Sequence, residues 1–438
     1  MTSKENQLDI LIENGTVLTM NKECSVIKNG AVAIKNDKIL AVGSKDELAD
    51  MKAVKTIDAK NGLIMPGLIN THTHAAMTLF RGMADDLPLM AWLNEHIFPA
   101  EAKLNAEKVY TGSTLACAEM IMSGTTCFCD MYLYEDQVAC AAKNAGVRAV
   151  TGEVLFDFSS PAYGPIEKGF EYTRMLAEKW KNDPLIRIAV EPHSPYLCSA
   201  DLLKKANEMA HEMDLLLVIH VSETKDEVAK SIATHGITPV ALLAETGVLS
   251  PRLLACHCVV LSENDISLLK QYDVKVAHNP ESNMKLASGI APIPLLLEKG
   301  IGIGLGTDGC SSNNDLDMFM EMDTAAKLHK VNDHDPTVMD AKTTLKMCTI
   351  EGAKALGISD LTGSIEPGKQ ADVIIINTRK PHLTPMYNPM SHLVYAVRGS
   401  DVDTSVINGR VVMENRELTT IDLEKIMADA RQCVEAFI

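Results

Sequence analysis

The sequence has no long apolar run and no cluster of basic residues. Its longest apolar runs, such as Leu215 to Ile219 and Val373 to Ile376, are far too short to span a bilayer, and residues 1–7 are polar where a signal peptide is apolar. The formal net charge is −17, and Lys and Arg are scattered along the chain. Nucleic acids and anionic membranes attract clustered cations, so neither is expected as a partner. These absences predict a soluble cytoplasmic protein.

The sequence also lacks the cysteine pattern of a disulfide framework. Its eleven cysteines are an odd number spread thinly through a long chain, which is typical of a reducing compartment. Two Cys-x-Cys pairs, Cys127 with Cys129 and Cys256 with Cys258, lie in apolar segments that resemble strands. Zinc knuckles use a wider spacing and a second pair of cysteines. We therefore expect buried structural thiols at both places.

No glycine-rich dinucleotide or phosphate-binding motif follows any expected strand. What the sequence does contain, from about Met65 to Gly368, is an alternation of short apolar strands with amphipathic helical patterns. Leu215 to His220 is one such strand and Ser199 to Met213 one such helix. This alternation indicates βα units and a parallel sheet. Its length predicts an α/β fold of the (β/α)8 TIM-like barrel type, with a doubly wound open sheet as the alternative.

Both ends of the chain have the pattern of β structure. Apolar runs flank Asn14-Gly15, Asn36-Asp37 and Asn408-Gly409, which are turn signals of β-hairpins. Each end is too small to bury a core alone, so we expect the two to pair into one small β-sandwich domain. The expected division is residues 1–65 and residues 368–438, the latter with a terminal helix, for the small domain, and residues 66–367 for the barrel.

The strongest chemical signal is an apolar strand that ends in His72-Thr73-His74. Alternate side chains of a strand share a face, so both imidazoles can converge on one metal ion. Other expected strands end in His220 (with Glu223 three residues later), in His257 and in Asp308. Barrel enzymes build their sites at the carboxyl ends of the strands. These residues together predict one site.

Three imidazoles and one carboxylate suit a single borderline divalent ion, most of all Zn²⁺. The predicted ligands are His72, His74, His220 and Asp308. Such a site leaves room for a water molecule, whose pKa falls towards about 7 on Zn²⁺ and which then supplies hydroxide at neutral pH.

Longer segments around these residues resemble the amidohydrolase superfamily and, within it, the 5′-methylthioadenosine/S-adenosylhomocysteine deaminases. The segments are THTHAAMTLFRGMADD (Thr71 to Asp86), EPHSPYLCS (Glu191 to Ser199), HVSE (His220 to Glu223), AHNPESNMKL (Ala277 to Leu286) and LGTDGCSSNN (Leu305 to Asn314). The resemblance extends over nearly the whole chain. It implies a metal-dependent hydrolase that deaminates an adenosine-type nucleoside to its inosine analogue and ammonia. The implied substrates are 5′-methylthioadenosine, 5′-deoxyadenosine, adenosine or S-adenosylhomocysteine.

The resemblance also implies a role for each site residue. His72, His74, His220 and Asp308 match the family's metal ligands. Glu223 matches the acid that donates a proton to purine N1, His257 the histidine that orients the hydroxide, and Asp308 the base that takes the proton of the attacking water. Glu101 matches the carboxylate that holds the ribose hydroxyls, and His193 matches a histidine that contacts the substrate.

Two departures from wider family patterns affect these expectations. Relatives with two metal ions bridge them with a modified Lys on the fourth strand, but the expected fourth strand, Ile188 to His193, has no Lys, so one ion is expected. Relatives that accept S-adenosylhomocysteine carry Arg after the third strand. In that stretch, Val147 to Asp157, this chain has Gly152 or Glu153 at the place of Arg, and Arg148 lies earlier. The loss of a bidentate contact to a carboxylate favours the other three nucleosides.

Two other functions are alternatives to nucleoside deamination. A related amidohydrolase could act on guanine, a pterin-like ring or an s-triazine, since the same chemistry displaces groups from electron-poor ring carbons. Glu101 discriminates, because these rings carry no ribose diol. A non-catalytic barrel scaffold would have lost ligands, whereas every expected ligand is present. The sequence is compatible with a homo-oligomer.

Overall fold

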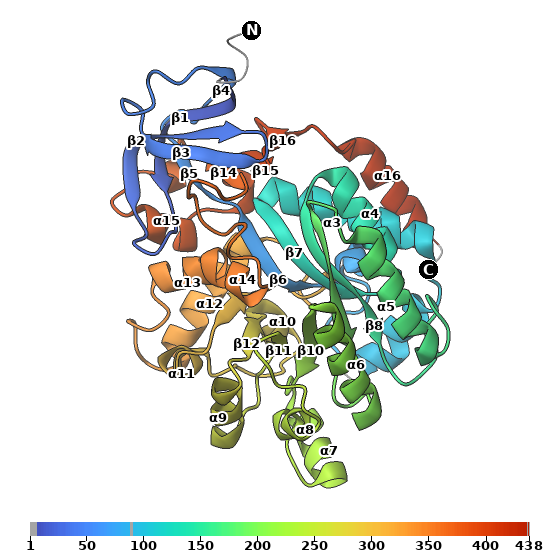
Figure 1. Ribbon diagram of the computed structural model, residues 1–438. Coiled ribbons are helices and arrows are strands. Elements are labelled where there is room, and N and C mark those ends of the chain that lie inside the picture. The colour runs from blue at the N-terminus through green and yellow to red at the C-terminus, as the bar shows by residue number, and fades with distance from the viewer. Residues whose placement is uncertain (1–6, 88–90, 436, 438) are drawn as a thin grey trace.

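The computed structural model describes residues 7–87, 91–435 and 437, so the polar residues 1–6 lie outside the described part. An eight-stranded parallel sheet curls into a barrel, and a nine-stranded mixed sheet drawn from both ends of the chain packs beside it (Figure 1). The expected TIM-like barrel with a small β domain from both chain ends is confirmed, and the open doubly wound sheet is not observed among the described strands.

The barrel strands follow one another around the sheet in chain order. They are β6 (Leu68–Thr73), β7 (Thr125–Tyr132), β8 (Arg148–Leu155), β9 (Ile186–Pro192), β10 (Leu216–Val221), β11 (Leu253–His257), β12 (Lys275–His278) and β13 (Ile303–Leu305). The last strand returns to the first just beyond its end, where the Asp308 amide donates to the His72 carbonyl at 2.9 Å. Gly306 permits this approach, because a Cβ there would lie 2.8 Å from the His72 nitrogen.

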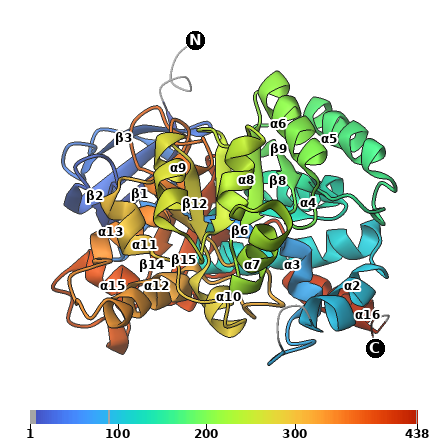
Figure 2. The same ribbon diagram turned by 90° about the horizontal axis from the view of Figure 1, so that it is seen from below.

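Helices surround these strands (Figure 2). The segment after β6 carries η1 (Ala75–Phe80), η2 (Trp92–Ile97), α2 (Phe98–Glu101) and α3 (Ala106–Ser123). Between later strands lie α4 (Glu135–Ala145), α5 (Ile166–Trp180), α6 (Ala200–Met213), α7 (Lys225–His235), α8 (Pro239–Glu245), α9 (Glu263–Gln271), α10 (Pro280–Lys285) and α11 (Ile293–Glu298). After β13 come α12 (Met318–Asn332), α13 (Ala341–Met347), α14 (Ile350–Ala355), η3 (Pro381–Leu383), α15 (Pro389–Tyr395), η4 (Gly399–Asp401) and α16 (Leu423–Val434).

The terminal sheet has the strand order β17-β16-β15-β14-β5-β1-β2-β3, with β4 paired to β1. Its strands are β1 (Leu8–Leu18), β2 (Val26–Lys35), β3 (Lys38–Ser44), β4 (Ala53–Asp58), β5 (Leu63–Pro66), β14 (Val373–Ile376), β15 (Val402–Ile407), β16 (Arg410–Glu414) and β17 (Glu417–Leu418). Antiparallel pairing of β5 with β14 joins the two chain ends. Val and Ile side chains such as Ile12, Val373 and Ile375 form the core of this sheet.

The hairpin turns at Asn36 and at Asn408-Gly409 are confirmed, since these residues take the left-handed conformation between paired strands. The predicted turn at Asn14-Gly15 is wrong. β1 runs straight through it, and the two residues form an irregularity in the pairing with β2. The physical reason is packing from outside the segment, because a Cβ on Gly15 would lie 2.6 Å from Ile64 Cδ1.

The base of the barrel, at the amino ends of its strands, is tied to the terminal sheet by a buried ion pair. Arg148 at the start of β8 donates from Nε to Asp372 Oδ2 at 3.0 Å and from Nη1 to the Pro184 carbonyl at 2.7 Å. Asp372 also accepts from the Asn408 amide at 2.7 Å. Every charged atom of this pair is therefore matched inside the protein.

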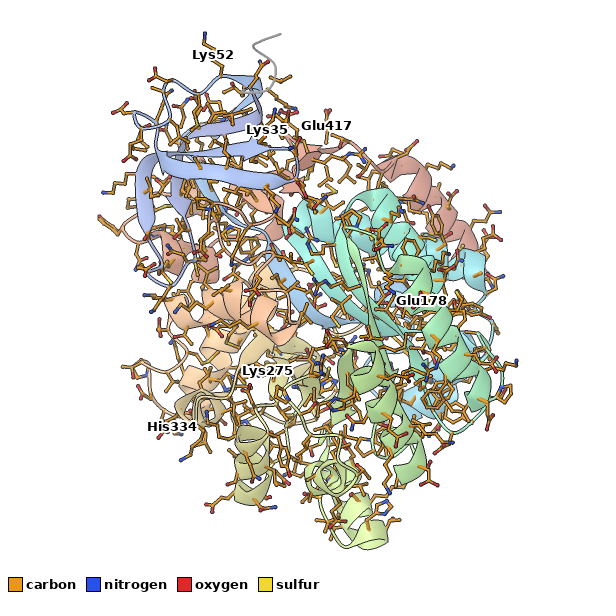
Figure 3. All side chains as sticks on the ribbon, viewed as in Figure 1. Lys35, Lys52, Glu178, Lys275, His334 and Glu417 are labelled. Carbon is orange, nitrogen blue, oxygen red and sulfur yellow. The ribbon has the colours of Figure 1, made fainter. Side chains whose placement is uncertain are left out.

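Three expectations from composition can be compared with the structure. All eleven cysteines are free, and both Cys-x-Cys pairs are buried, as expected of structural thiols. Exposed charged side chains of both signs are spread over the molecule, as Lys52, Glu178 and Glu417 show in Figure 3. None of the described helices has the length and apolarity that crossing a membrane requires.

Candidate active site

A cavity of about 490 Å³ opens at the carboxyl ends of the barrel strands, where the sequence predicted the site. Its lining includes all but one of the predicted site residues: His74, Glu101, His193, His220, Glu223, His257 and Asp308. The exception, His72, is fully buried directly beneath them. The structure therefore brings every predicted site residue to one place.

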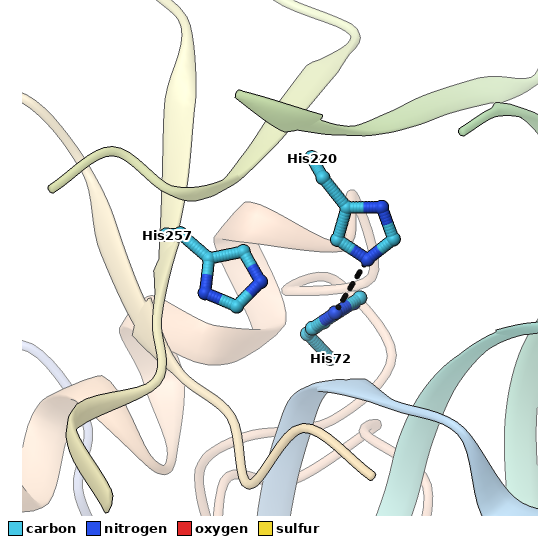
Figure 4. Close-up of side chains that lie close together, drawn as sticks. All are labelled: His72, His220 and His257. Carbon is cyan, nitrogen blue, oxygen red and sulfur yellow. Dashed lines mark hydrogen bonds between the residues drawn. The ribbon is translucent and has the colours of Figure 1, made fainter. Parts of the chain in front are cut away.

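The predicted ligand atoms converge from two strands, β6 and β10, and from the segment just after β13. His72 and His74 lie on the same face of β6 because they are two residues apart. His72 Nε2 is 3.2 Å from His220 Nε2 at the end of β10, and His257 of β11 lies beside both (Figure 4). Asp308 Oδ1 is 3.1 Å from His74 Nε2 and 3.5 Å from His72 Nε2.

Backbone carbonyls fix the orientation of two of these imidazoles. His220 Nδ1 is 2.8 Å from the His193 carbonyl, and His74 Nδ1 contacts the Met131 carbonyl. A carbonyl only accepts, so in each ring Nδ1 carries the hydrogen and Nε2 presents a lone pair. The lone pair of His220 thus faces His72 Nε2 at a distance that only a shared proton or a cation makes favourable.

The orientation of the fourth group, the Asp308 carboxylate, is also fixed by hydrogen bonds. Its Oδ2 accepts from Ser282 Oγ at 2.6 Å and from Ser312 Oγ at 3.0 Å, which leaves Oδ1 directed at the imidazoles. Although burial opposes the charged form, contact with this carboxylate raises the pKa of His74 to about 9. The cluster therefore attracts positive charge, and its donor set fits a divalent ion.

The backbone is strained at the two strand ends that carry His257 and Asp308. Both residues have positive φ, 73° and 60°, in the left-handed region that non-glycine residues rarely adopt. Such conformations cost about 1–3 kcal/mol each and persist where the surrounding structure imposes them. Here the strain turns both side chains into the cavity.

A buried acid lies beside the imidazole cluster. Glu223 Oε2 is 4.0 Å from His257 Nε2, and burial raises the pKa of the Glu223 carboxyl above its ordinary range. His257 Nδ1 is 2.9 Å from Asn283 Oδ1 and donates to it, so His257 Nε2 is turned towards Glu223 and the cluster. A carboxyl with a raised pKa next to such a cluster can deliver a proton.

Glu101 and His193 complete the polar lining. Glu101 ends α2, near Tyr132, and burial within the cavity raises its pKa to about 7. His193 follows β9, and burial lowers the pKa of its imidazole to about 3, so this ring is neutral. Both side chains line the cavity: Glu101 from the segment after β6, and His193 beside His220, with ring centroids 4.8 Å apart.

Sequence reasoning missed the aromatic residues of the lining, which are Trp92, Phe98, Tyr132, Phe156, Phe158 and Tyr196. The fourth barrel strand, β9, contains no Lys, as expected. At the third strand, β8, the places considered for an arginine do not reach the cavity. Glu153 turns away and accepts from the Glu135 amide at 2.9 Å, while Phe156 and Phe158 line the wall instead. Strand alternation counted from the end of β8 could have indicated them.

Four fully buried carboxyl groups, whose burial the sequence did not indicate, lie under this side of the site. They are Asp130, Glu135, Glu153 and Glu191. Burial raises the pKa of each, to about 6 for Asp130 and to about 8 for Glu153. Asp130 Oδ1 accepts from the Ala75 amide at 2.5 Å and so fixes the turn after His74. No local pattern in the sequence distinguishes such acids from surface charges.

Comparison with known proteins places this site in a family. The chain is 57% identical, over 97% of its length, to a 5-methylthioadenosine/S-adenosylhomocysteine deaminase of Syntrophobacter fumaroxidans, 98% of which is covered. It is 47% identical to a 5′-deoxyadenosine deaminase of Methanosarcina acetivorans, with 98% of both chains covered. A crystal structure of an adenosine deaminase from Xanthomonas campestris with bound zinc superposes with a TM-score of 0.97 at 40% identity, covering 99% of both chains. The Amidohydrolase family model matches residues 63–412. With its barrel, its converging histidines and these relatives, the chain belongs to the amidohydrolase family.

Proposed function

We propose that this protein deaminates a 5′-substituted adenosine hydrolytically, giving the inosine analogue and ammonia. The observation that carries the proposal is one cavity that joins three groups: the imidazole and carboxylate cluster, the buried acid Glu223, and the carboxylate Glu101 on the opposite side. Relatives at 47% and 57% identity, named as deaminases of 5′-deoxyadenosine and of 5-methylthioadenosine/S-adenosylhomocysteine, support the substrate class.

We infer that the cluster holds one divalent ion, most of all zinc, through His72, His74, His220 and Asp308. The facing nitrogens of His72 and His220 and the free Oδ1 of Asp308 support this assignment. When bound, such an ion supplies a water molecule acidic enough to attack at neutral pH. The absence of Lys from β9 supports one ion over a bridged pair.

The side chains of this protein divide the remaining work between them. Glu223, whose pKa is raised by burial, donates a proton to purine N1, which makes C6 electron-poor. Asp308 Oδ1 takes the proton of the attacking water, and His257, fixed through Asn283, orients that water. The proton held on Asp308 then reaches the departing amino group, which leaves as ammonia, and Glu223 takes back the hydroxyl proton at C6 to give the 6-oxo product.

We assign the orientation of the substrate to Glu101 and His193. The carboxylate of Glu101 can accept from both hydroxyls of a ribose diol, because an ionised carboxylate offers two acceptor oxygens. His193 is neutral and can donate or accept at the edge of the nucleoside. The diol contact separates this function from its rivals, since guanine, pterins and s-triazines have no ribose.

The domain division is part of the same proposal. We assign residues 66–367 to the barrel with its site, and residues 1–65 and 368–438 to one small domain. The pairing of β5 with β14, and the break between β5 and β6 at Gly67, support these boundaries.

The test is ammonia release by the zinc-loaded protein on a panel of 5′-methylthioadenosine, 5′-deoxyadenosine, adenosine, S-adenosylhomocysteine, guanine and an s-triazine. We expect turnover of nucleosides only, and a fall in kcat of about 10²- to 10⁴-fold in Glu223→Gln, because general acid catalysis contributes that much. Turnover of guanine or the triazine alone would leave the barrel and its ion cluster intact and refute the substrate. Zinc content of Glu223→Gln serves as the control, since Glu223 is not among the proposed ligands.

A further inference from the structure

One wall of the cavity is apolar and aromatic. Phe156 and Phe158 follow the end of β8 and stack face to face, with ring centroids 3.9 Å apart and planes 11° from parallel. Phe156 is 6% exposed and Phe158 47% exposed, so the pair extends from the interior to the mouth. Leu133, Val154 and Pro161 continue the same wall. Among the described residues that line the cavity, none is Lys or Arg.

The position of this wall relative to the reacting groups follows from the order of the strands. Glu223 follows β10 and His257 ends β11, which are the fifth and sixth strands of the barrel. Glu101 lies in the segment after the first strand, β6, and Phe156 follows the third, β8. A nucleoside with N1 at Glu223 and its diol at Glu101 therefore directs its 5′ carbon towards the aromatic wall.

Charged groups near the wall do not favour an anion either. Asp157 lies between the two phenylalanines in sequence. Its Oδ1 accepts a hydrogen bond from the Ser199 hydroxyl at 3.2 Å. Ser160 Oγ accepts from the Ala162 amide at 3.1 Å. A carboxylate placed against this wall would lose its hydration and meet a negative neighbour instead of a cation.

We propose that Phe156 and Phe158 select the 5′ substituent, admitting small apolar groups such as methylthio or hydrogen and rejecting the charged amino-acid group of S-adenosylhomocysteine. This inference rests on the proposed nucleoside deamination. Burial of a methylthio group against two aromatic faces is favourable, and sulfur packs well on aromatic rings. The carboxylate of a zwitterion against the same surface has no cationic partner. The wall thus favours one of the two substrates in the name of the similar Syntrophobacter enzyme over the other.

The first experiment compares kcat/KM for 5′-methylthioadenosine and S-adenosylhomocysteine in the zinc-loaded wild-type protein. We expect a preference of at least about a hundredfold for the methylthio compound, because apolar pockets discriminate by about that factor and an unpaired charge adds to it. Values within about threefold of each other would overturn the inference without any variant.

The second experiment asks whether the two phenylalanines carry the preference. Phe158→Arg supplies a cation at a partly exposed position, where the substitution leaves the core intact, and should narrow the preference at least about tenfold by pairing with the carboxylate. Phe156→Leu removes one ring and should reduce the preference for 5′-methylthioadenosine by a smaller factor. Met175→Arg is the matched control, because it adds the same charge at an exposed position on α5 outside the cavity. A preference that moves equally in Phe158→Arg and Met175→Arg would refute the assignment.

The ratio of two substrates within one preparation is independent of how much protein is active. If the wild-type protein deaminates none of the nucleosides, the proposed function is refuted and this inference with it. Nucleoside turnover with an unaltered ratio in Phe158→Arg would refute this inference alone.

Discussion

Buried charged groups are partnered differently at the two ends of the barrel: the base, at the amino ends of the strands, and the mouth, at their carboxyl ends. At the base, Arg148 and Asp372 find all their partners within the protein. At the mouth, His72 and His220 present nitrogens to each other, and Asp308 leaves one oxygen for the imidazoles. Charge at the base joins two sheets, whereas the charged groups at the mouth are those that we propose to hold an ion and to act on a substrate. The contrast separates residues of stability from residues of function.

The largest expected effect comes from removing a proposed ligand at the mouth. His220→Ala should lose the bound zinc and all measurable ammonia release, because the cluster no longer surrounds an ion. Metal analysis of the purified variant and the deaminase assay check this. His211→Ala, an exposed histidine on α6, should keep both properties. Full zinc content and activity in His220→Ala would show that the mouth does not work as described.

A substitution at the base should lower the stability of the protein and leave its kcat unchanged. Arg148→Met leaves Asp372 buried without its partner and should lower the free energy of unfolding by about 3–5 kcal/mol, as breaking a buried ion pair does. The kcat of the folded fraction should stay at the wild-type value, because Arg148 does not line the cavity. Denaturant unfolding and active-site titration measure the two. Lys168→Met, which removes an exposed pair with Glu171, is the control and should change stability little. A fall in kcat without a fall in stability would break the comparison.

The diol contact at the mouth should have a smaller and substrate-dependent effect. Glu101→Gln should lower kcat/KM for 5′-methylthioadenosine by about tenfold to a hundredfold, the range for hydrogen bonds to a charged group. The same variant should barely affect 2′,3′-dideoxyadenosine, which lacks both hydroxyls. Equal losses on the two substrates would mean that Glu101 does not hold the ribose.

A pH-dependent effect concerns the buried acids between the two ends. Burial raises the pKa of Glu153 from an ordinary 4.5 to about 8, so the folded state binds the proton more tightly than the unfolded state. Its contribution to stability is fully present below about pH 4.5 and is lost as the pH rises to about 8. Glu153→Gln, which keeps an acceptor for the Glu135 amide, should therefore gain stability relative to wild type between about pH 5 and about pH 9. An exposed change, Glu171→Gln, should show no such trend.

The mouth was predictable because its signals are local. His72 and His74 share a face by strand alternation alone, and His220, His257 and Asp308 end strands whose apolar runs are visible in the sequence. The barrel followed from periodicity in the same way. The pairing of the chain ends, which are distant in sequence, was predicted because each end alone is too small to bury a core.

The parts that were not predicted depend on contacts distant in sequence. The bulge at Asn14-Gly15 exists because Ile64 of another strand packs against it. The buried state of Glu191 depends on Gly152 of the adjacent strand, where a Cβ would lie 2.4 Å from Glu191 Cγ. Phe156 reaches the cavity because of where β8 ends, a boundary that the sequence places less precisely than the strand itself.

The central claim is that water replaces the amino group at C6 of an intact nucleoside. Turnover of 5′-methylthioadenosine in water enriched in heavy oxygen, followed by mass spectrometry of the nucleoside product, tests it most directly. The account predicts 5′-methylthioinosine that carries one heavy oxygen on the base, with one ammonia released per product. Release of free adenine, or an unlabelled product, would contradict it.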